Sequence, residues 1–142
     1  MRLALPFVFL ACPAAAWEYT PVPICTLSQT TEAAEVTVTY DPALPEYAIT
    51  ITLLDGTWPD GPVFTLAFEG GTPLTIQTDR HALSDGDKSV TVRDRGFGNV
   101  LNGMEFSGIA VALLGDAVLP IPLTGIKGPM QSFRNCPEDA LS

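Results

Sequence analysis

Two short charged stretches hold the side chains of this sequence that are best suited to chemistry. They are residues 79–81 (Asp-Arg-His) and 93–95 (Arg-Asp-Arg), which stand on either side of a predicted turn. In a hairpin centred on that turn, residue 79 falls opposite residue 92 or 93, so Asp79 and Arg93 are placed to pair across the strands. His81, the single histidine of the chain, has the ionisation range of a general base near neutral pH.

The same residues also suit a role without chemistry. Charged side chains at strand ends maintain register and discourage pairing with another chain, and an exposed ion pair contributes only about 0–1 kcal/mol. No serine stands in the Gly-x-Ser-x-Gly turn of a serine hydrolase. We therefore expect solvated strand ends, with contact to a small anion or a partner as the functional interpretation. No catalytic residue is predicted, and the alternative is a minor enzyme that uses His81 with Asp79 and Arg93.

Trp58 lies in a loop between two strand patterns, where its ring either is presented to a ligand or folds back over the end of the sheets. We expect the second arrangement. The turn at residues 85–87 lacks the closing Glu of a calcium loop, and one histidine with a bonded cysteine pair cannot form a zinc site. We predict no metal and no cofactor. The candidate binding residues are Asp79, Arg80, His81, Arg93, Arg95 and Trp58.

The charge balance narrows the classes of partner. The chain has 7 Lys and Arg against 16 Asp and Glu, which gives a formal net charge of −9. Nucleic acids and anionic lipid surfaces repel such a polyanion, because both bind through Lys and Arg. We expect no nucleic-acid partner, and we expect a monomer.

The first sixteen residues have the pattern of an export signal. A positive start at Arg2 is followed by an apolar run over residues 3–10 and by small residues at 14–16, as signal peptidase requires. The apolar run is shorter than the roughly 20 residues that a membrane-spanning helix needs. We therefore predict cleavage after Ala16 and a periplasmic or secreted protein that comprises residues 17–142 and has no membrane span.

Removal of the signal leaves two of the three cysteines. Cys12 departs with the signal, and in an oxidising compartment the remaining pair, Cys25 and Cys136, is expected to form a disulfide that closes a loop of about 110 residues. Two free buried thiols are the alternative for this pair. Residues 10–12 (Leu-Ala-Cys) also resemble a lipidation box, although Pro13 follows directly, so a lipid anchor at Cys12 stays open.

Alternation of apolar and polar residues dominates the middle of the chain. It is typical of half-buried strands, and the intervening segments are rich in Asp, Gly and Pro, which favour turns. A single, mainly β domain results, an antiparallel β-sandwich or open barrel with two short helices. The alternating stretches are residues 36–40, 47–53, 64–68, 74–76 and 90–92.

The last third has a different pattern. Apolar residues at helical spacing predict a short helix over residues 97–104. Residues 109–114 are apolar on both faces, which predicts a strand covered on both sides, and the prolines within 119–123 place that strand at an edge. A second helix is predicted to begin near Gly128 and to end at Cys136 and Pro137.

The region 89–136 contains a predicted strand, short helix, two strands and closing helix. Its clearest part is residues 119–125 followed by Met130 and Phe133. This succession resembles the invasion-associated locus B family of bacterial exported proteins. The resemblance implies a periplasmic β-rich domain and brings no active residues.

Four further stretches, at residues 17–19, 23–25, 78–81 and 94–101, are similar to small exported proteins of marine-type alphaproteobacteria. Such proteins often carry the name of the helicase component of the excinuclease ABC system. That name does not fit these residues, because the chain is acidic, too short for a helicase, and has no Gly-x-x-x-x-Gly-Lys-Ser/Thr loop to hold nucleotide phosphates.

Together these observations predict an exported binding or structural module whose partner is a protein or cell-envelope component. Besides the enzyme alternative, a carrier of a lipid or other apolar ligand is open. In such a carrier the strand at residues 109–114 would line a void instead of filling a core.

Overall fold

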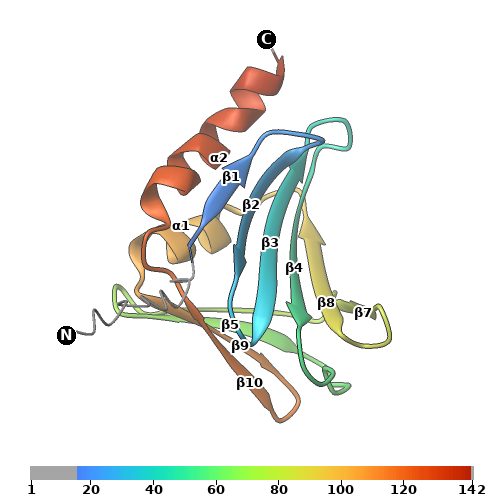
Figure 1. The fold of residues 1–142 in the computed structure, drawn as a ribbon. Helices are drawn as coiled ribbons and strands as arrows, with labels where there is room; N and C mark the ends of the chain where they lie inside the picture. The colour runs from blue at the N-terminus through green and yellow to red at the C-terminus, as the bar shows by residue number, and fades with distance from the viewer. Residues whose placement is uncertain (1–15, 142) are drawn as a thin grey trace, which may run out of the picture.

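The computed structural model describes residues 16–141 (Figure 1). Apart from Ala16, the predicted export signal lies outside the described residues, and so does the alternative lipidation site at Cys12. Between residues 16 and 141, neither helix has the length and apolar character needed to cross a membrane.

Six antiparallel strands form the larger sheet. Its spatial order is β1 (Glu18–Thr20), β2 (Cys25–Thr30), β3 (Ala34–Asp41), β4 (Glu46–Leu53), β8 (Ser89–Asp94) and β7 (Ala82–Ser84). The register of β3 against β4 places Val36 opposite Ile51 and Val38 opposite Ile49. All four side chains are buried, so the apolar members of the alternating pattern line the inner face.

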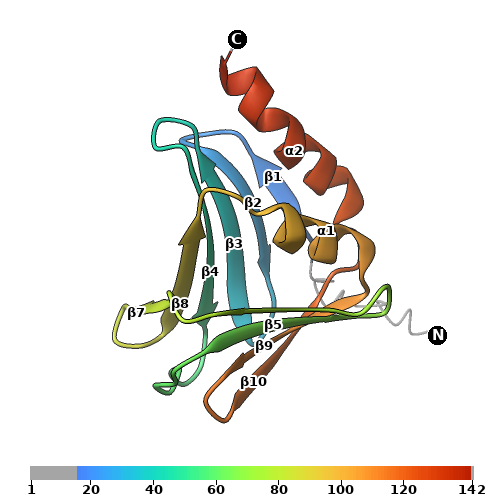
Figure 2. The same cartoon turned by 180° about the vertical axis from the view of Figure 1, so that it is seen from behind.

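The smaller sheet has four antiparallel strands. Their order is β10 (Ala117–Pro122), β9 (Ile109–Leu114), β5 (Phe64–Glu69) and β6 (Leu74–Thr78). The two sheets lie face to face, and their strands cross steeply (Figure 2). In the part of the chain that the structure describes, neither sheet closes on itself. The predicted mainly β fold is confirmed, in its sandwich form.

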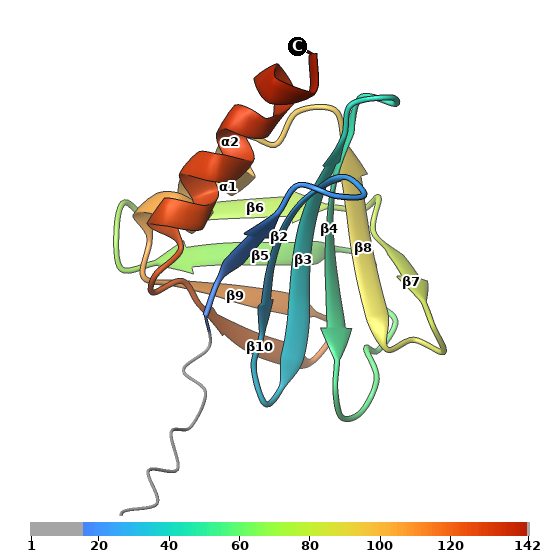
Figure 3. The same cartoon turned by 45° about the horizontal axis from the view of Figure 1, so that its top comes forward.

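Two helices cover one end of the sandwich (Figure 3). The first, α1 (Gly98–Phe106), has the predicted buried face. Gly103 lets it approach β5, because a Cβ at this position would lie 2.6 Å from the ring of Phe68. The second, α2 (Lys127–Leu141), packs against β1, β2 and α1. It continues past Pro137, so the prediction that this proline ends the helix is wrong; the missing N–H removes only one hydrogen bond of the helix.

The strand β9 also differs from its prediction. Ala110, Ala112 and Leu114 are buried, whereas the alternate residues Ile109, Val111 and Leu113 are only half-buried. The helices lie at the end of the sandwich, not over the outer face of this sheet (Figure 2). The strand is therefore covered fully on one side alone. The predicted edge position of the proline-containing strand is confirmed, since β10 borders the sheet.

One backbone carbonyl, that of Pro122, joins the two sheets at the corner where β1 and β2 meet β10. It accepts a hydrogen bond from the Trp17 indole Nε1 at 3.1 Å and another from the Gln29 side-chain Nε2 at 2.9 Å. Both donors are almost fully buried. A buried polar group without a partner costs about 1–3 kcal/mol, so this shared acceptor holds the corner closed.

Long-range links fix α2 in place. Cys136 on α2 is bonded to Cys25 on β2, with a Cα–Cα distance of 6.2 Å, as the sequence predicted. The second link is Glu105 on α1, which is 6% exposed. Its carboxylate accepts hydrogen bonds from Arg134 Nε at 2.7 Å and from Gln131 Nε2 at 2.8 Å. These contacts tie the two helices to each other and to the larger sheet.

Replacing both cysteines, as C25S/C136S, should lower the free energy of unfolding by about 3–5 kcal/mol. The reason is that the disulfide restricts a loop whose ends are 111 residues apart in the unfolded chain. Urea unfolding under oxidising conditions measures this change. An unchanged midpoint would show that the bond has no part in stability.

Glu105→Ala should lower the free energy of unfolding by about 2–3 kcal/mol, because it leaves Arg134 Nε and Gln131 Nε2 without their acceptor. The loss is smaller than for a fully buried ion pair, since the Arg134 side chain is 29% exposed. Glu46→Ala is the matched control. Its ion pair with Arg93 is longer, at 3.7 Å, and the Arg93 side chain is 62% exposed, so the loss should cost less than about 1 kcal/mol. Equal costs for the two variants would contradict the assignment.

Candidate functional site

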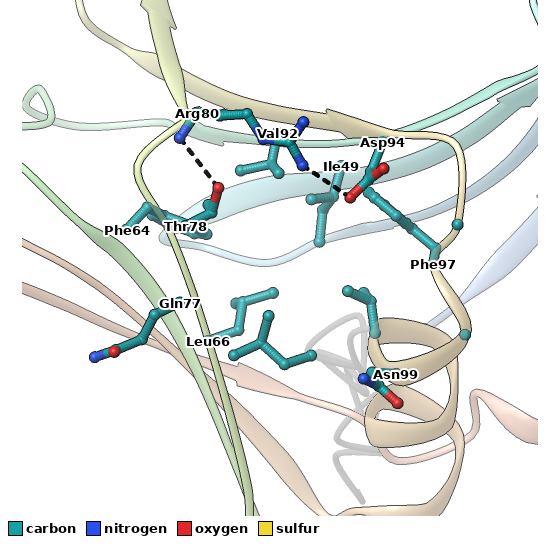
Figure 4. Close-up of a pocket in the computed structure, with 14 residues that line it drawn as sticks. Ile49, Phe64, Leu66, Gln77, Thr78, Arg80, Val92, Asp94, Phe97 and Asn99 are labelled. Carbon is teal, nitrogen blue, oxygen red and sulfur yellow. Dashed lines mark hydrogen bonds and ion pairs between the residues drawn. The ribbon is translucent and has the colours of Figure 1, made fainter.

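A cavity of about 430 Å³ lies between the two sheets, next to the start of α1 (Figure 4). Strands β4 and β8 supply one wall, β5 and β6 supply the opposite wall, and the segment that leads into α1 supplies the third. The residues that line the cavity are Ile49, Phe64, Leu66, Ile76, Gln77, Thr78, Arg80, Val92, Asp94, Gly96, Phe97, Gly98, Asn99 and Val100.

The interior of the cavity is apolar for the same reason as the core. Strand alternation directs Ile49 and Leu66 toward the facing sheet. The space stays open because β6 is the last strand of its sheet and β7 has only three residues. No further strand lies there, within residues 16–141, to bring side chains into this corner.

An ion pair spans the mouth of the cavity. Arg80, which follows β6, places its Nη2 3.1 Å from Oδ2 of Asp94 at the end of β8 (Figure 4). The side chains are 69% and 45% exposed. The backbone N–H of Arg80 donates to the Thr78 hydroxyl at 3.0 Å, and the backbone N–H of Arg95 donates to Asp94 Oδ1 at 2.7 Å. Local hydrogen bonds therefore orient both partners.

The predicted pair of Asp79 with Arg93 is wrong. Arg93 reaches Glu46 instead, at 3.7 Å between Nη1 and Oε1. Val92 and Asp94 line the cavity, so the alternation of β8 puts Arg93 on the outer face of the sheet. Asp79 is exposed, and it forms no ion pair or hydrogen bond with the rest of the described chain.

The register explains the difference. The predicted turn exists, with Asp85, Gly86 and Asp87 at positive φ values of 55°, 62° and 66°. The ladder beyond it is short, because β7 begins only at Ala82, which pairs with Thr91. Residue 79 thus lies outside the ladder, and the next residue, Arg80, forms a salt bridge with Asp94 instead.

The contacts of His81 hold two segments of the fold together. Its Nε2 lies 2.9 Å from the Gly61 carbonyl oxygen; a carbonyl only accepts, so Nε2 carries the hydrogen. Its Nδ1 is buried and has no partner among the described residues. The ring thus tethers the loop before β5 to the segment after β6. No described contact joins any two of His81, Asp79 and Arg93, the residues of the enzyme alternative.

Trp58 folds back into the molecule. It is 2% exposed, and its Nε1 donates to the Ile51 carbonyl at 3.1 Å. The indole meets the ring of Phe64 edge to face at 6.4 Å between centroids. Trp58 therefore supports the cavity from behind Phe64 and presents no surface to a ligand. Arg95 is exposed beside the mouth and is not a lining residue.

Aromatic stacking supports the wall next to α1. The Tyr47 ring stacks on Phe97 at 5.4 Å and contacts Phe133 at 6.2 Å. Burial raises the pKa of the Tyr47 phenol, the neighbouring Tyr40 raises it further, and the Arg134 guanidinium opposes the rise. Tyr47 thus links α2 to the lining residue Phe97.

Sequence reasoning found Arg80 among the lining residues and missed the position of the cavity, which the carrier alternative placed at residues 109–114. One signal in the sequence could have indicated the open corner. Residues 74–84 have a weak apolar content, whereas three other strands alternate strongly. In the part of the chain that the structure describes, no three His, Cys, Asp or Glu side chains are grouped to hold a metal ion.

The architecture defines the class of this protein as an antiparallel β-sandwich with two helices and a cavity between its sheets. Comparison with protein-family models, with curated proteins and with solved structures found no match to the chain. The resemblance of residues 89–136 to the invasion-associated locus B family stays a prediction.

Alkaline titration followed by tyrosinate absorbance should show the Tyr47 phenol ionising above the ordinary range of tyrosine. Because the pKa of Tyr47 is raised in the folded protein, its proton is kept at pH values where the unfolded chain loses it. The free energy of unfolding should then fall as the pH rises above about 10. Tyr47→Phe should remove the late titration and flatten that fall. Unaltered curves for this variant would contradict the assignment.

Proposed function

We propose that this protein is an exported binding module that holds a small, largely apolar ligand between its two sheets. The observation that carries the proposal is the cavity of about 430 Å³ with an apolar interior and a polar mouth. Small-molecule sites in proteins have volumes of about 300–1,000 Å³ and combine an apolar lining with a few polar groups.

The arrangement of polar groups supports binding over catalysis. A general base needs a ring nitrogen or carboxylate within hydrogen-bond reach of the reacting group. His81 is not among the residues that line the cavity, and its Nε2 is already bonded to Gly61. The charged lining residues, Arg80 and Asp94, are paired with each other. A site of this kind recognises a ligand without transforming it.

The location of the cavity differs from that expected for a carrier. The sequence pointed to residues 109–114 as the lining, whereas β9 contributes no lining residue. Its inward side chains fill the core. Export to the periplasm or the medium is part of the proposal. It is supported by the disulfide and by the signal-like start of the chain. A protein or cell-envelope partner stays a prediction.

Ile76→Trp tests the proposal, since Ile76 is half-buried on β6 and faces the cavity. The larger ring should occupy ligand space and weaken binding of the neutral apolar dye Nile red to the disulfide-bonded chain by about tenfold. This corresponds to losing the burial of about 60 Å² of ligand surface, or about 1.5 kcal/mol. Fluorescence titration measures the dissociation constant.

Val118→Trp is the matched control, because it adds the same ring at a position of β10 that is 64% exposed and outside the cavity. Its dissociation constant should stay within about twofold of the original value. Equal weakening by both variants, or no binding of the dye to the unaltered protein, would reject the cavity as the binding site.

A further inference from the structure

The two charged groups at the mouth of the cavity, Arg80 and Asp94, differ in how many of their hydrogen-bonding atoms already have a partner. Both Asp94 oxygens already accept hydrogen bonds, Oδ2 from Arg80 and Oδ1 from the backbone of Arg95. A guanidinium group has five N–H donors. Within residues 16–141, only Nη2 of the Arg80 guanidinium has a partner. The mouth thus offers unused N–H donors, while each carboxylate oxygen there already accepts a hydrogen bond.

We propose that the ligand is a medium-chain aliphatic carboxylate, with its hydrocarbon chain between the sheets and its carboxylate on Arg80. This inference rests on the proposed function and names the ligand class of the same cavity. The planar guanidinium can donate two parallel N–H bonds to a carboxylate, an arrangement that is stronger than a neutral hydrogen bond. No other cation lines the cavity in the described part of the chain.

The volume of the cavity sets an upper limit on the length of the ligand. A methylene group occupies a volume close to that of a water molecule, roughly 30 Å³ in the liquid. A cavity of about 430 Å³ therefore holds at most about fourteen non-hydrogen atoms. Dodecanoate has this size. Its chain would lie against Leu66, Ile76 and Val100, the apolar residues on three of the elements that form the walls.

Asp94 does not prevent the binding of an anion. Its ion pair with Arg80 is exposed, and such a pair contributes only about 0–1 kcal/mol. The remaining N–H groups of Arg80 can donate to the ligand carboxylate while Asp94 stays in place. The acidic surface beyond the mouth has little effect, because physiological salt screens charges over about 8 Å.

Displacement of Nile red from the disulfide-bonded chain compares three ligands of equal chain length: dodecanoate, dodecanol and dodecylammonium. Dodecanoate should bind at least about tenfold more tightly than the other two. Arg80→Gln should weaken dodecanoate by about 10–100-fold, the value of a hydrogen bond to a charged group, and leave dodecanol within about twofold. Asp94→Asn should strengthen dodecanoate, because it removes the competing carboxylate.

Arg93→Gln is the matched control. It also removes one positive charge, but from the face of β8 that points away from the cavity. Arg93 is about as exposed as Arg80 and has its own acidic partner. Both ligands should bind this variant as they bind the unaltered protein. If Arg93→Gln lost as much dodecanoate affinity as Arg80→Gln, the effect would come from net charge alone. The proposed role of Arg80 would then be wrong.

The remaining outcomes separate the two proposals. Equal binding of dodecanoate and dodecanol, a preference for dodecylammonium, or a dodecanoate preference that survives Arg80→Gln would each overturn the carboxylate site. The binding module would still stand in those cases, provided that Ile76→Trp weakens the ligands. If the unaltered protein binds neither Nile red nor any of the three, the proposed function itself is wrong.

Discussion

The geometry of the cavity follows from the angle between the two sheets. Sheets whose strands cross steeply cover each other near the crossing point and separate toward the corners. In this molecule one corner is closed by Trp17 and Gln29, which share the Pro122 carbonyl. The helices cover one end (Figure 3). The corner between β6 and β8 is spanned only by the exposed Arg80–Asp94 ion pair among the described residues, and the apolar positions that would meet there surround a space instead. The cavity needs no special motif, because it follows from where the strands stop.

The wall beside α1 depends on contacts that come from the far end of the chain. Met130 and Phe133 on α2 are fully buried, and Phe133 contacts Tyr47, which stacks on the lining residue Phe97. The disulfide and the Glu105 carboxylate hold α2 where these rings can meet. Helix α1 is short and cannot maintain its position alone, since isolated helices below about 12–15 residues are marginal. Stability at the end of the chain is therefore linked to the shape of the cavity.

The strands and the disulfide could be predicted because each depends on a local or pairwise rule. Alternation identifies the inner face of β3 and β4 whatever their neighbours are, and the two cysteines that follow the predicted signal allow a single pairing. The partner of Arg80 could not be predicted, because it depends on β7 beginning at Ala82 and not earlier. The position of the cavity escaped prediction for a similar reason. It is set by the angle and length of strands distant in sequence, and each lining residue by itself resembles an ordinary core residue.

The burial of Trp17 has a consequence for how the amino terminus can be trimmed. This residue stands directly before β1, yet it is as deeply enclosed as the middle of the molecule. A cut after Trp17, one position beyond the predicted cleavage after Ala16, would remove an indole from the interior. It would leave the Pro122 carbonyl with Gln29 as its single side-chain donor. The predicted cleavage after Ala16 keeps Trp17, and with it this contact between the sheets.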